Sequence, residues 1–280
     1  MPNNTVRTSA HEDTWVEHPG GRIFARTWHP MKATGHAVAA SPVVLFHDSL
    51  GCVDLWRNFP ALLSESTGRR VIAYDRLGFG RSDPRCDTPG LDFIADEAQT
   101  YFPAVCEQLG VKRFIAFGHS VGGGMAVYCA AKFSDACDGL ITESAQAFAE
   151  DKTVQGILAA KESFKQAGQI ARLEKYHGDK ATWVLNAWTE TWPNPEFSRW
   201  SLENVLPKVT CPLLVIHGAH DEYGSLRHPE MIAKRSSGPV RVEIMADTDH
   251  VPHREHEETV IELTRNFIGS LAYIQPHEDD

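Results

Sequence analysis

The sequence predicts an α/β fold with a mostly parallel, doubly wound sheet and an inserted helical cap. Short apolar runs rich in Val, Ile and Phe recur along the chain, and amphipathic helical patterns separate them. Alternation of strands and helices is typical of this class. Only residues 146–207 interrupt the alternation, because they contain no convincing strand.

Five apolar runs predict the central strands. They are nearly continuous rather than alternating, which is typical of strands buried on both faces of a parallel sheet. The runs cover residues 42–47, 70–75, 113–119, 138–144 and 212–218. An earlier segment, residues 21–30, does alternate, and we expect it to form an antiparallel edge hairpin with the residues before it.

The helices are predicted from apolar residues at a spacing of three or four. In the first of them, Phe93, Ala98 and Phe102 would face the sheet, and the pattern continues to Leu109 as one helix. The expected helices cover residues 93–109, 122–133, 227–236 and 256–274.

The stretch without a strand predicts the domain organisation. Residues 146–207 are helical, polar and aromatic in character, and they contain four of the seven tryptophans. We expect a helical cap there, inserted into a core domain made of residues 13–145 and 208–273, with tails at residues 1–12 and 274–280.

Composition excludes several classes of function. The chain has 280 residues, of which 42% are apolar, enough for one large domain. Its net charge of −10 argues against binding to nucleic acid or to an anionic membrane. No run of 18 apolar residues and no apolar signal segment occurs, so we expect neither a membrane span nor secretion.

The six cysteines are scattered and form no C-x-x-C pair. In a chain of this length they indicate buried thiols of a reducing compartment instead of a disulfide framework. We therefore expect a cytoplasmic protein. Its oligomeric state is expected to be a monomer or a homodimer, and its partner a small molecule.

The strongest motif is Gly118-x-Ser120-x-Gly122, which stands between a predicted strand and a predicted helix. Glycines on both sides of the serine allow a tight turn, which holds the hydroxyl exposed above the sheet. The start of the following helix favours developing negative charge. We interpret Ser120 as a nucleophile.

A serine needs a base, and the base needs an orienting acid, in the chain order Ser, Asp or Glu, His. Asp221 follows the strand at 212–218, and His250 follows the next strand. Loops at the carboxyl ends of parallel strands share one edge of the sheet, so these side chains can meet Ser120. The alternatives for the acid are Glu143 above all, and also Glu222, Asp247 and Asp249.

Two further sets of residues fall at this edge of the predicted sheet. His250, His253 and His256 recur at a spacing of three, but Pro252 interrupts a helix there, and we predict no metal site. An oxyanion needs two backbone donors. We predict the N–H groups of Val121 and Ser49, with Leu50 as the alternative to Ser49.

These motifs together resemble the α/β-hydrolase superfamily, over about residues 20–270. "GHSVGG" resembles its nucleophile turn, and "HGAHDEY" and "DHVPH" resemble its acid and histidine loops. "YDRLGFGRSD" resembles the loop after its fourth strand, where Arg76 and Asp83 would hold the loop geometry. Two departures are Asp48 where the oxyanion loop usually has glycine, and Asp249 before the histidine.

The resemblance implies a catalytic triad of Ser120, His250 and Asp221, an acyl-enzyme intermediate, and no requirement for a cofactor. It does not decide the substrate. The cap suggests a closed pocket for a small to medium, partly apolar carboxylic ester. His119, Trp188 and Trp192 are candidates for the pocket wall.

Several alternatives remain open. The same triad is compatible with hydrolysis of a carbon–carbon bond in a vinylogous diketone, and with lactone hydrolysis, amide hydrolysis or perhydrolysis. A different class of function is a ligand receptor with vestigial, slow hydrolysis.

Overall fold

A computed structural model describes residues 10–31 and 40–271 of the chain. Its eight-stranded sheet has the order β1-β2-β4-β3-β5-β6-β7-β8. Strands β1 and β2 pair antiparallel with each other, β2 pairs antiparallel with β4, and the remaining neighbours are parallel. The strands are β1 (His11–Val16), β2 (Ile23–Trp28), β3 (Val43–Phe46), β4 (Val71–Tyr74), β5 (Phe114–His119), β6 (Cys137–Glu143), β7 (Leu213–Gly218) and β8 (Val240–Met245).

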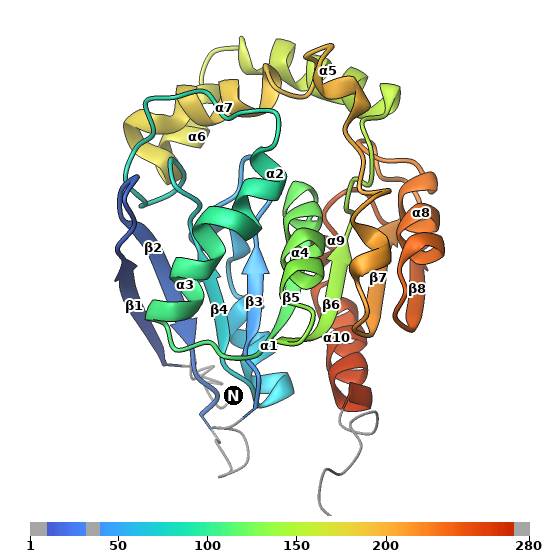
Figure 1. The fold of residues 1–280 in the computed structure, drawn as a ribbon. Helices are drawn as coiled ribbons and strands as arrows, with labels where there is room; N and C mark the ends of the chain where they lie inside the picture. The colour runs from blue at the N-terminus through green and yellow to red at the C-terminus, as the bar shows by residue number, and fades with distance from the viewer. Residues whose placement is uncertain (1–9, 32–39, 272–280) are drawn as a thin grey trace, which may run out of the picture.

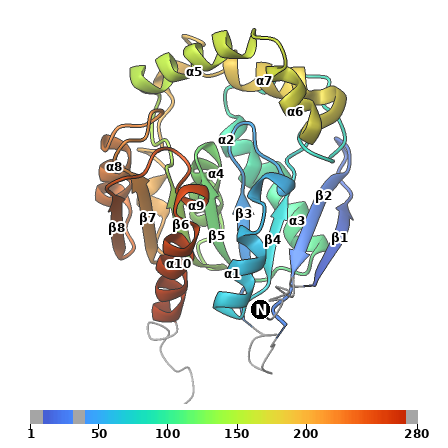
Figure 2. The same cartoon turned by 180° about the vertical axis from the view of Figure 1, so that it is seen from behind.

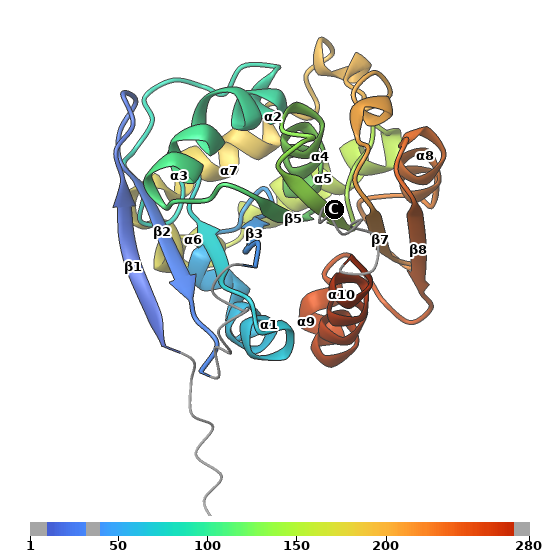
Figure 3. The same ribbon diagram turned by 60° about the horizontal axis from the view of Figure 1, so that its bottom comes forward.

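Helices cover both faces of this sheet, as Figure 3 shows. One face carries α2, α3, α4 and α8, and the other carries α1, α9 and α10 (Figures 1 and 2). The helices are α1 (Phe59–Thr67), α2 (Phe93–Asp96), α3 (Phe102–Gln108), α4 (Val121–Lys132), α5 (Asp151–Phe164), α6 (Gln169–His177), α7 (Ala181–Thr189), α8 (Arg227–Arg235), α9 (Pro252–Glu255) and α10 (Glu257–Leu271). Short helical turns lie at η1 (Val53–Trp56), η2 (Glu97–Tyr101), η3 (Gly178–Lys180), η4 (Phe197–Arg199) and η5 (Leu206–Lys208).

The continuous apolar runs have the expected structural cause. In β3, Val44 and Phe46 are buried under the first helical layer, whereas Val43 and Leu45 are buried under the second. Each central strand therefore contributes side chains to two separate cores, and a polar residue on either face would be buried. The predicted doubly wound α/β fold and the antiparallel edge hairpin are confirmed.

Between β6 and β7 the chain leaves the sheet and forms α5, α6 and α7, which lie across the top of the molecule in Figure 1. These helices stand beyond the upper ends of the strands. They fall within the segment 146–207 that we expect to be a cap.

Two predicted boundaries differ from the structure. The segment 93–109 is not one regular helix, because the wide π-type turn η2 separates α2 from α3. Pro103 follows this turn and lacks the N–H that a regular helix would use, which explains the interruption. Strand β1 begins at His11, so residues 11 and 12 belong to the sheet and not to the expected tail. The expected tail at 274–280 lies outside the described residues.

Among the residues that the structure describes, no helix combines the length and apolarity needed to cross a bilayer. All six cysteines are among them and are free, four of them buried, with Cys86 exposed and Cys106 half-buried.

The junction of β5 and α4 positions the serine. Ser120 has a φ of 56° and a ψ of −126°, a backbone conformation that is strained for any residue except glycine. A Cβ atom on Gly118 would lie 2.2 Å from the carbonyl oxygen of Gly122, and one on Gly122 would lie 2.1 Å from that of Phe46. Both contacts are with backbone, so the turn has room for glycine alone.

We predict that Gly122→Ala lowers the free energy of unfolding by about 1–3 kcal/mol, because overpacking against backbone forces a main-chain shift. As a matched control, Gly269→Ala in α10 should raise it by about 0.5–1 kcal/mol, since alanine favours helix and its Cβ meets nothing within 4 Å. Urea denaturation of both variants measures the two values. A neutral Gly122→Ala change would contradict the packing argument.

Candidate active site

Three side chains from separate loops meet above the carboxyl ends of β5, β7 and β8. His250 Nε2 lies 3.0 Å from Ser120 Oγ. On the other side of the ring, His250 Nδ1 lies 2.8 Å and 2.9 Å from the two carboxylate oxygens of Asp221. The structure thus brings together the serine, histidine and aspartate that the sequence predicts as nucleophile, base and acid.

Asp221 is held in one orientation. Its side chain is fully buried, and Oδ1 accepts the backbone N–H groups of Tyr223 and Gly224 at 2.8 Å and 3.0 Å. Burial alone would raise the pKa of Asp221, but the hydrogen bond and charge of His250 lower it below its usual value. The carboxylate is therefore ionised and can orient the Nδ1–H of His250.

The start of α5 is attached to the loop that carries this carboxylate. Lys152 Nζ donates to the carbonyl oxygen of Asp221 at 2.5 Å, and Thr153 Oγ1 donates to that of Tyr223 at 2.5 Å. Glu150 accepts the backbone N–H and the hydroxyl of Ser225. A segment that follows β6 thereby fixes a loop that follows β7.

The alternative acids lie elsewhere. Glu143 is fully buried, and its Oε2 accepts the Nδ1–H of His253 at 2.6 Å, so it pairs with a different histidine. Asp249 and Asp247 contribute backbone groups to hydrogen bonds, with Glu255 and His256 respectively. The His253 ring also packs on Trp56, with ring centroids 4.6 Å apart.

The loop after β3 contains the candidate oxyanion donors. The N–H of Leu50 donates to Asp48 Oδ1 at 2.8 Å and is therefore engaged. Among the described residues, the N–H of Ser49 has no hydrogen-bond acceptor, and Ser49 borders the same cavity as Ser120. Val121 is the first residue of α4, where a helix leaves backbone N–H groups without partners.

Arg76 binds the backbone of the loop that follows β3. Its guanidinium is buried, and it donates to the carbonyl oxygen of Asp48 at 2.7 Å. Asp83 accepts the backbone N–H of Arg22 at 2.8 Å and the Arg22 guanidinium. Arg76 thus joins the loop after β4 to the loop after β3, and Asp83 joins it to Arg22, the residue before β2.

A cavity of about 320 Å³ opens over Ser120, between the sheet and helices α5–α7. Trp188 and Trp192 both line it, as does His119, although only 1% of His119 is exposed. The other apolar and aromatic residues of the wall are Leu50, Leu55, Ile157, Phe164, Leu173, Tyr176, Tyr223 and Val251, and its charged residues include Asp48, Arg172 and Arg254.

Sequence reasoning missed Gln146. Its Oε1 lies 3.3 Å from Ser120 Oγ and it lines the cavity. The hydroxyl therefore faces two acceptors, Gln146 Oε1 and His250 Nε2, with a single proton. The only signal in the sequence is that Gln146 follows the β6 strand closely, at the edge where the other loops converge.

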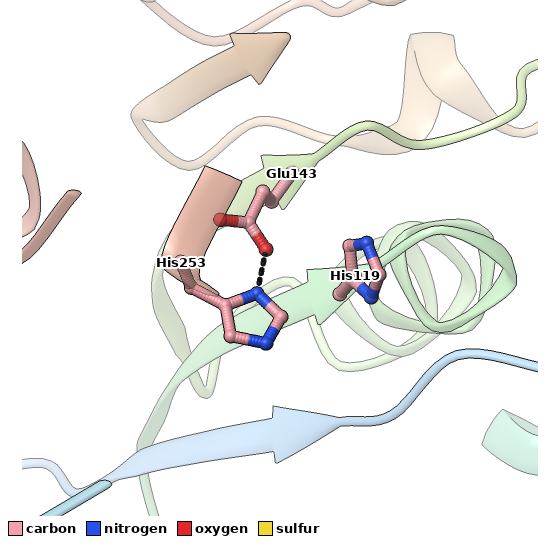
Figure 4. A group of neighbouring side chains, drawn as sticks. All are labelled: His119, Glu143 and His253. Carbon is pink, nitrogen blue, oxygen red and sulfur yellow. Dashed lines mark hydrogen bonds and ion pairs between the residues drawn. The ribbon is translucent and has the colours of Figure 1, made fainter. Parts of the chain in front are cut away.

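One group of side chains has the donor types of a metal site. Atoms of His119, Glu143 and His253 lie within 4.8 Å of one another, and all three residues are buried (Figure 4). The hydrogen bond between His253 and Glu143 occupies one carboxylate oxygen and one ring nitrogen, and an ion that used these two atoms would have to break it. His256 points elsewhere, with Nε2 against the carbonyl oxygen of Asp247.

Comparisons with known proteins concern the fold and the family of this chain. The family model described as alpha/beta hydrolase fold matches residues 41–179. A bifunctional esterase/perhydrolase from Acinetobacter calcoaceticus is 36% identical over 116 residues, which cover 41% of this chain and 37% of the relative. The chain spans only about a third of the length of the first curated relatives that it matches.

Two solved structures share the fold over nearly the whole chain. Proline iminopeptidase from Mycobacterium smegmatis is 22% identical with a TM-score of 0.69, over 93% of this chain and 98% of the other. An enol-lactonase from Burkholderia xenovorans LB400 is 18% identical with a TM-score of 0.69, over 91% of this chain and 100% of the other.

His228 is a buried histidine that bonds Glu150, the residue that holds the loop after Asp221, and its titration tests this packing. Its Nδ1 accepts the N–H of Ala147 at 3.1 Å, and its Nε2–H donates to Glu150 at 3.0 Å. Burial lowers the pKa of His228 to about 4. Unfolded histidine titrates near pH 6.5, so between these values the unfolded state binds more protons.

We therefore predict that His228 titrates at least about 1.5 pH units below a free histidine in a two-dimensional NMR titration. The free energy of unfolding should rise with pH between about 4 and 6.5, and His228→Gln should weaken this dependence. The variant also assigns the resonance. Titration of His228 near pH 6.5 would show that the ring is not buried as described.

Proposed function

Because this chain belongs to the α/β-hydrolase superfamily, we propose that it is a serine hydrolase that cleaves a small to medium, partly apolar carboxylic ester through an acyl-enzyme. The observation that carries the proposal is the continuous hydrogen-bonded array from Ser120 Oγ through His250 to Asp221 at the floor of a cavity.

In the proposed reaction, His250 Nε2 takes the proton of Ser120 as Oγ attacks the ester carbonyl carbon. Asp221 holds the ring in the tautomer with a proton on Nδ1 and stabilises the imidazolium that forms. The imidazolium then donates its Nε2 proton to the leaving alkoxide, which departs as an alcohol. Water, deprotonated by His250, attacks the acyl-enzyme; the acyl–Oγ bond breaks, His250 returns the proton to Ser120 Oγ, and the carboxylic acid is released.

The tetrahedral intermediate carries a negative oxygen. In our proposal the N–H groups of Val121 and Ser49 donate to it, because the first begins a helix and the second is without an acceptor among the described residues. Leu50 is a poorer candidate because its N–H already donates to Asp48.

The size of the cavity favours a small substrate over a polymeric one. Its volume of about 320 Å³ lies at the lower end of the range for small-molecule sites, and its wall is mostly apolar. Helices α5–α7 act in this proposal as a cap that limits substrate size, with Trp188 and Trp192 in contact with the acyl or alcohol group. The esterase/perhydrolase relative supports ester chemistry.

The proposal is tested by the hydrolysis of p-nitrophenyl esters from acetate to dodecanoate. We predict a short-chain optimum, and a loss of about 10⁴-fold or more in kcat for Ser120→Ala. Ser198→Ala, an exposed serine outside the cavity lining, is the control and should leave kcat unchanged. If Ser120→Ala were as active as the wild type, the assignment of Ser120 as the nucleophile would be wrong.

If no ester of the series is cleaved, labelling of Ser120 by an organophosphonate distinguishes two situations. A labelled serine would mean that the nucleophile is active and that the scissile bond is of another kind, a lactone or a carbon–carbon bond. An unlabelled serine would count against a serine hydrolase altogether.

The assignment of the acid gives a second prediction. Asp221→Asn should lower kcat by about 10⁴-fold, because the amide no longer selects the reactive tautomer of His250. Glu143→Gln should have a far smaller effect on kcat, since Glu143 bonds His253. The two variants are compared on the same ester. A larger loss in Glu143→Gln would reverse the assignment.

A further inference from the structure

A carboxylate stands beside the proposed oxyanion site. Asp48 immediately precedes Ser49, and its Oδ1 accepts the N–H of Leu50 at 2.8 Å. A negative charge here opposes the negative oxygen that catalysis would create. We infer that His119 carries a positive charge, is the counter-ion of Asp48, and ties the oxyanion loop to the loop of His250. This inference rests on the proposed function.

The contacts of the two ring nitrogens of His119, one a hydrogen bond and one an ion pair, indicate where its protons are. His119 Nε2 lies 2.9 Å from the backbone carbonyl oxygen of His250. A carbonyl oxygen only accepts, so Nε2 carries a proton. The other nitrogen, Nδ1, is buried and lies 3.6 Å from Asp48 Oδ2. If Nδ1 had no proton, its lone pair would face a carboxylate; with one, the ring is an imidazolium.

The charges around the ring support the same state. His119 also lies beside Glu143, which is fully buried (Figure 4). Burial by itself would lower the pKa of His119, but the carboxylates of Asp48 and Glu143 raise it above the usual value. Burial lowers the pKa of His253, which is therefore neutral and donates to Glu143.

The titratable groups that face His119 come from four parts of the chain. They are Asp48 after β3, Glu143 at the end of β6, His250 after β8, and His253 in α9, whose neighbour Arg254 acts on Asp48. With Arg254 near Asp48, two carboxylates are balanced by two cations without the use of Asp221 or His250.

His119 is thus a positioning residue with two contacts that matter. One contact reaches Asp48, which orients the peptide segment that carries the Ser49 N–H. The other reaches the backbone of the base, His250, whose ring stands 5.2 Å from the His119 ring. Loss of the positive charge on His119 would leave the two carboxylates of Asp48 and Glu143 with Arg254 as their one cation, and so with a net negative charge beside the oxyanion.

The test is a double-mutant cycle with Asp48→Asn, His119→Gln and the double variant, measured as kcat and KM on the best ester. We expect His119→Gln to lose about 10- to 100-fold in kcat, with KM within about 3-fold, because the unpaired carboxylate acts on the transition state. Asp48→Asn should lose less kcat than His119→Gln, since asparagine still accepts the Leu50 N–H and puts no negative charge beside the oxyanion. Glu262→Gln, an exposed carboxylate on α10, is the control for a change in net charge.

The double variant decides the outcome. It should recover most of the kcat lost in His119→Gln, because no unpaired charge remains. If it is as slow as His119→Gln or slower, the counter-ion role is overturned. A pH profile adds a second readout: wild-type kcat should decline as pH rises through the pKa of His119, and Asp48→Asn should lack this decline.

A measurement independent of turnover keeps the inference separate from the proposed function. Nitrogen-15 NMR of the His119 ring in wild type and in Ser120→Ala should show both nitrogens protonated at pH 7, and Asp48→Asn should lower the pKa of the ring. A neutral His119 at pH 7 overturns the inference whether or not esters are cleaved. A charged ring without ester cleavage would leave the charge pair intact and count against the proposed function alone.

Discussion

The close approach of three backbone segments at Gly118, Gly122 and Phe46 is the constraint on which the site depends. It brings the end of β5, the start of α4 and the end of β3 within van der Waals contact. The strained conformation of Ser120 is held by this packing and by its N–H, which donates to the carbonyl oxygen of Glu143. The hydroxyl, the helix terminus and the oxyanion loop therefore share one rigid frame.

The fold could be predicted from sequence because two-sided burial leaves a strong signal. Strands such as β3 and β5 are apolar at every position that faces a core, and the elbow glycines stand at a strand–helix junction. In β8, Val242 and Ile244 alternate with charged residues but are exposed, so apolar patterning in this strand does not report burial. The interruption at η2 depends on how one proline is accommodated, which periodicity does not report.

The site was predictable only in part, for a related reason. The order of Ser120, Asp221 and His250 along the chain follows the order of strands, so their meeting could be expected. Gln146 beside Ser120, and the pairing of Glu143 with His253, depend on side-chain direction at the strand ends. A one-residue change there reverses which face a side chain occupies, and apolar patterning does not resolve it.

The sheet order has a consequence for how the site comes into existence. β5, which precedes Ser120, pairs with β3 and β6, whereas Asp221 lies in the loop after β7 and His250 in the loop after β8. Contacts across the site join residues 130 positions apart in sequence. Such non-local pairings form late and cooperatively. No partly assembled sheet contains the complete array, so we expect the nascent chain to acquire it only after β8 has docked, and a ribosome-bound fragment that ends before β8 to lack it.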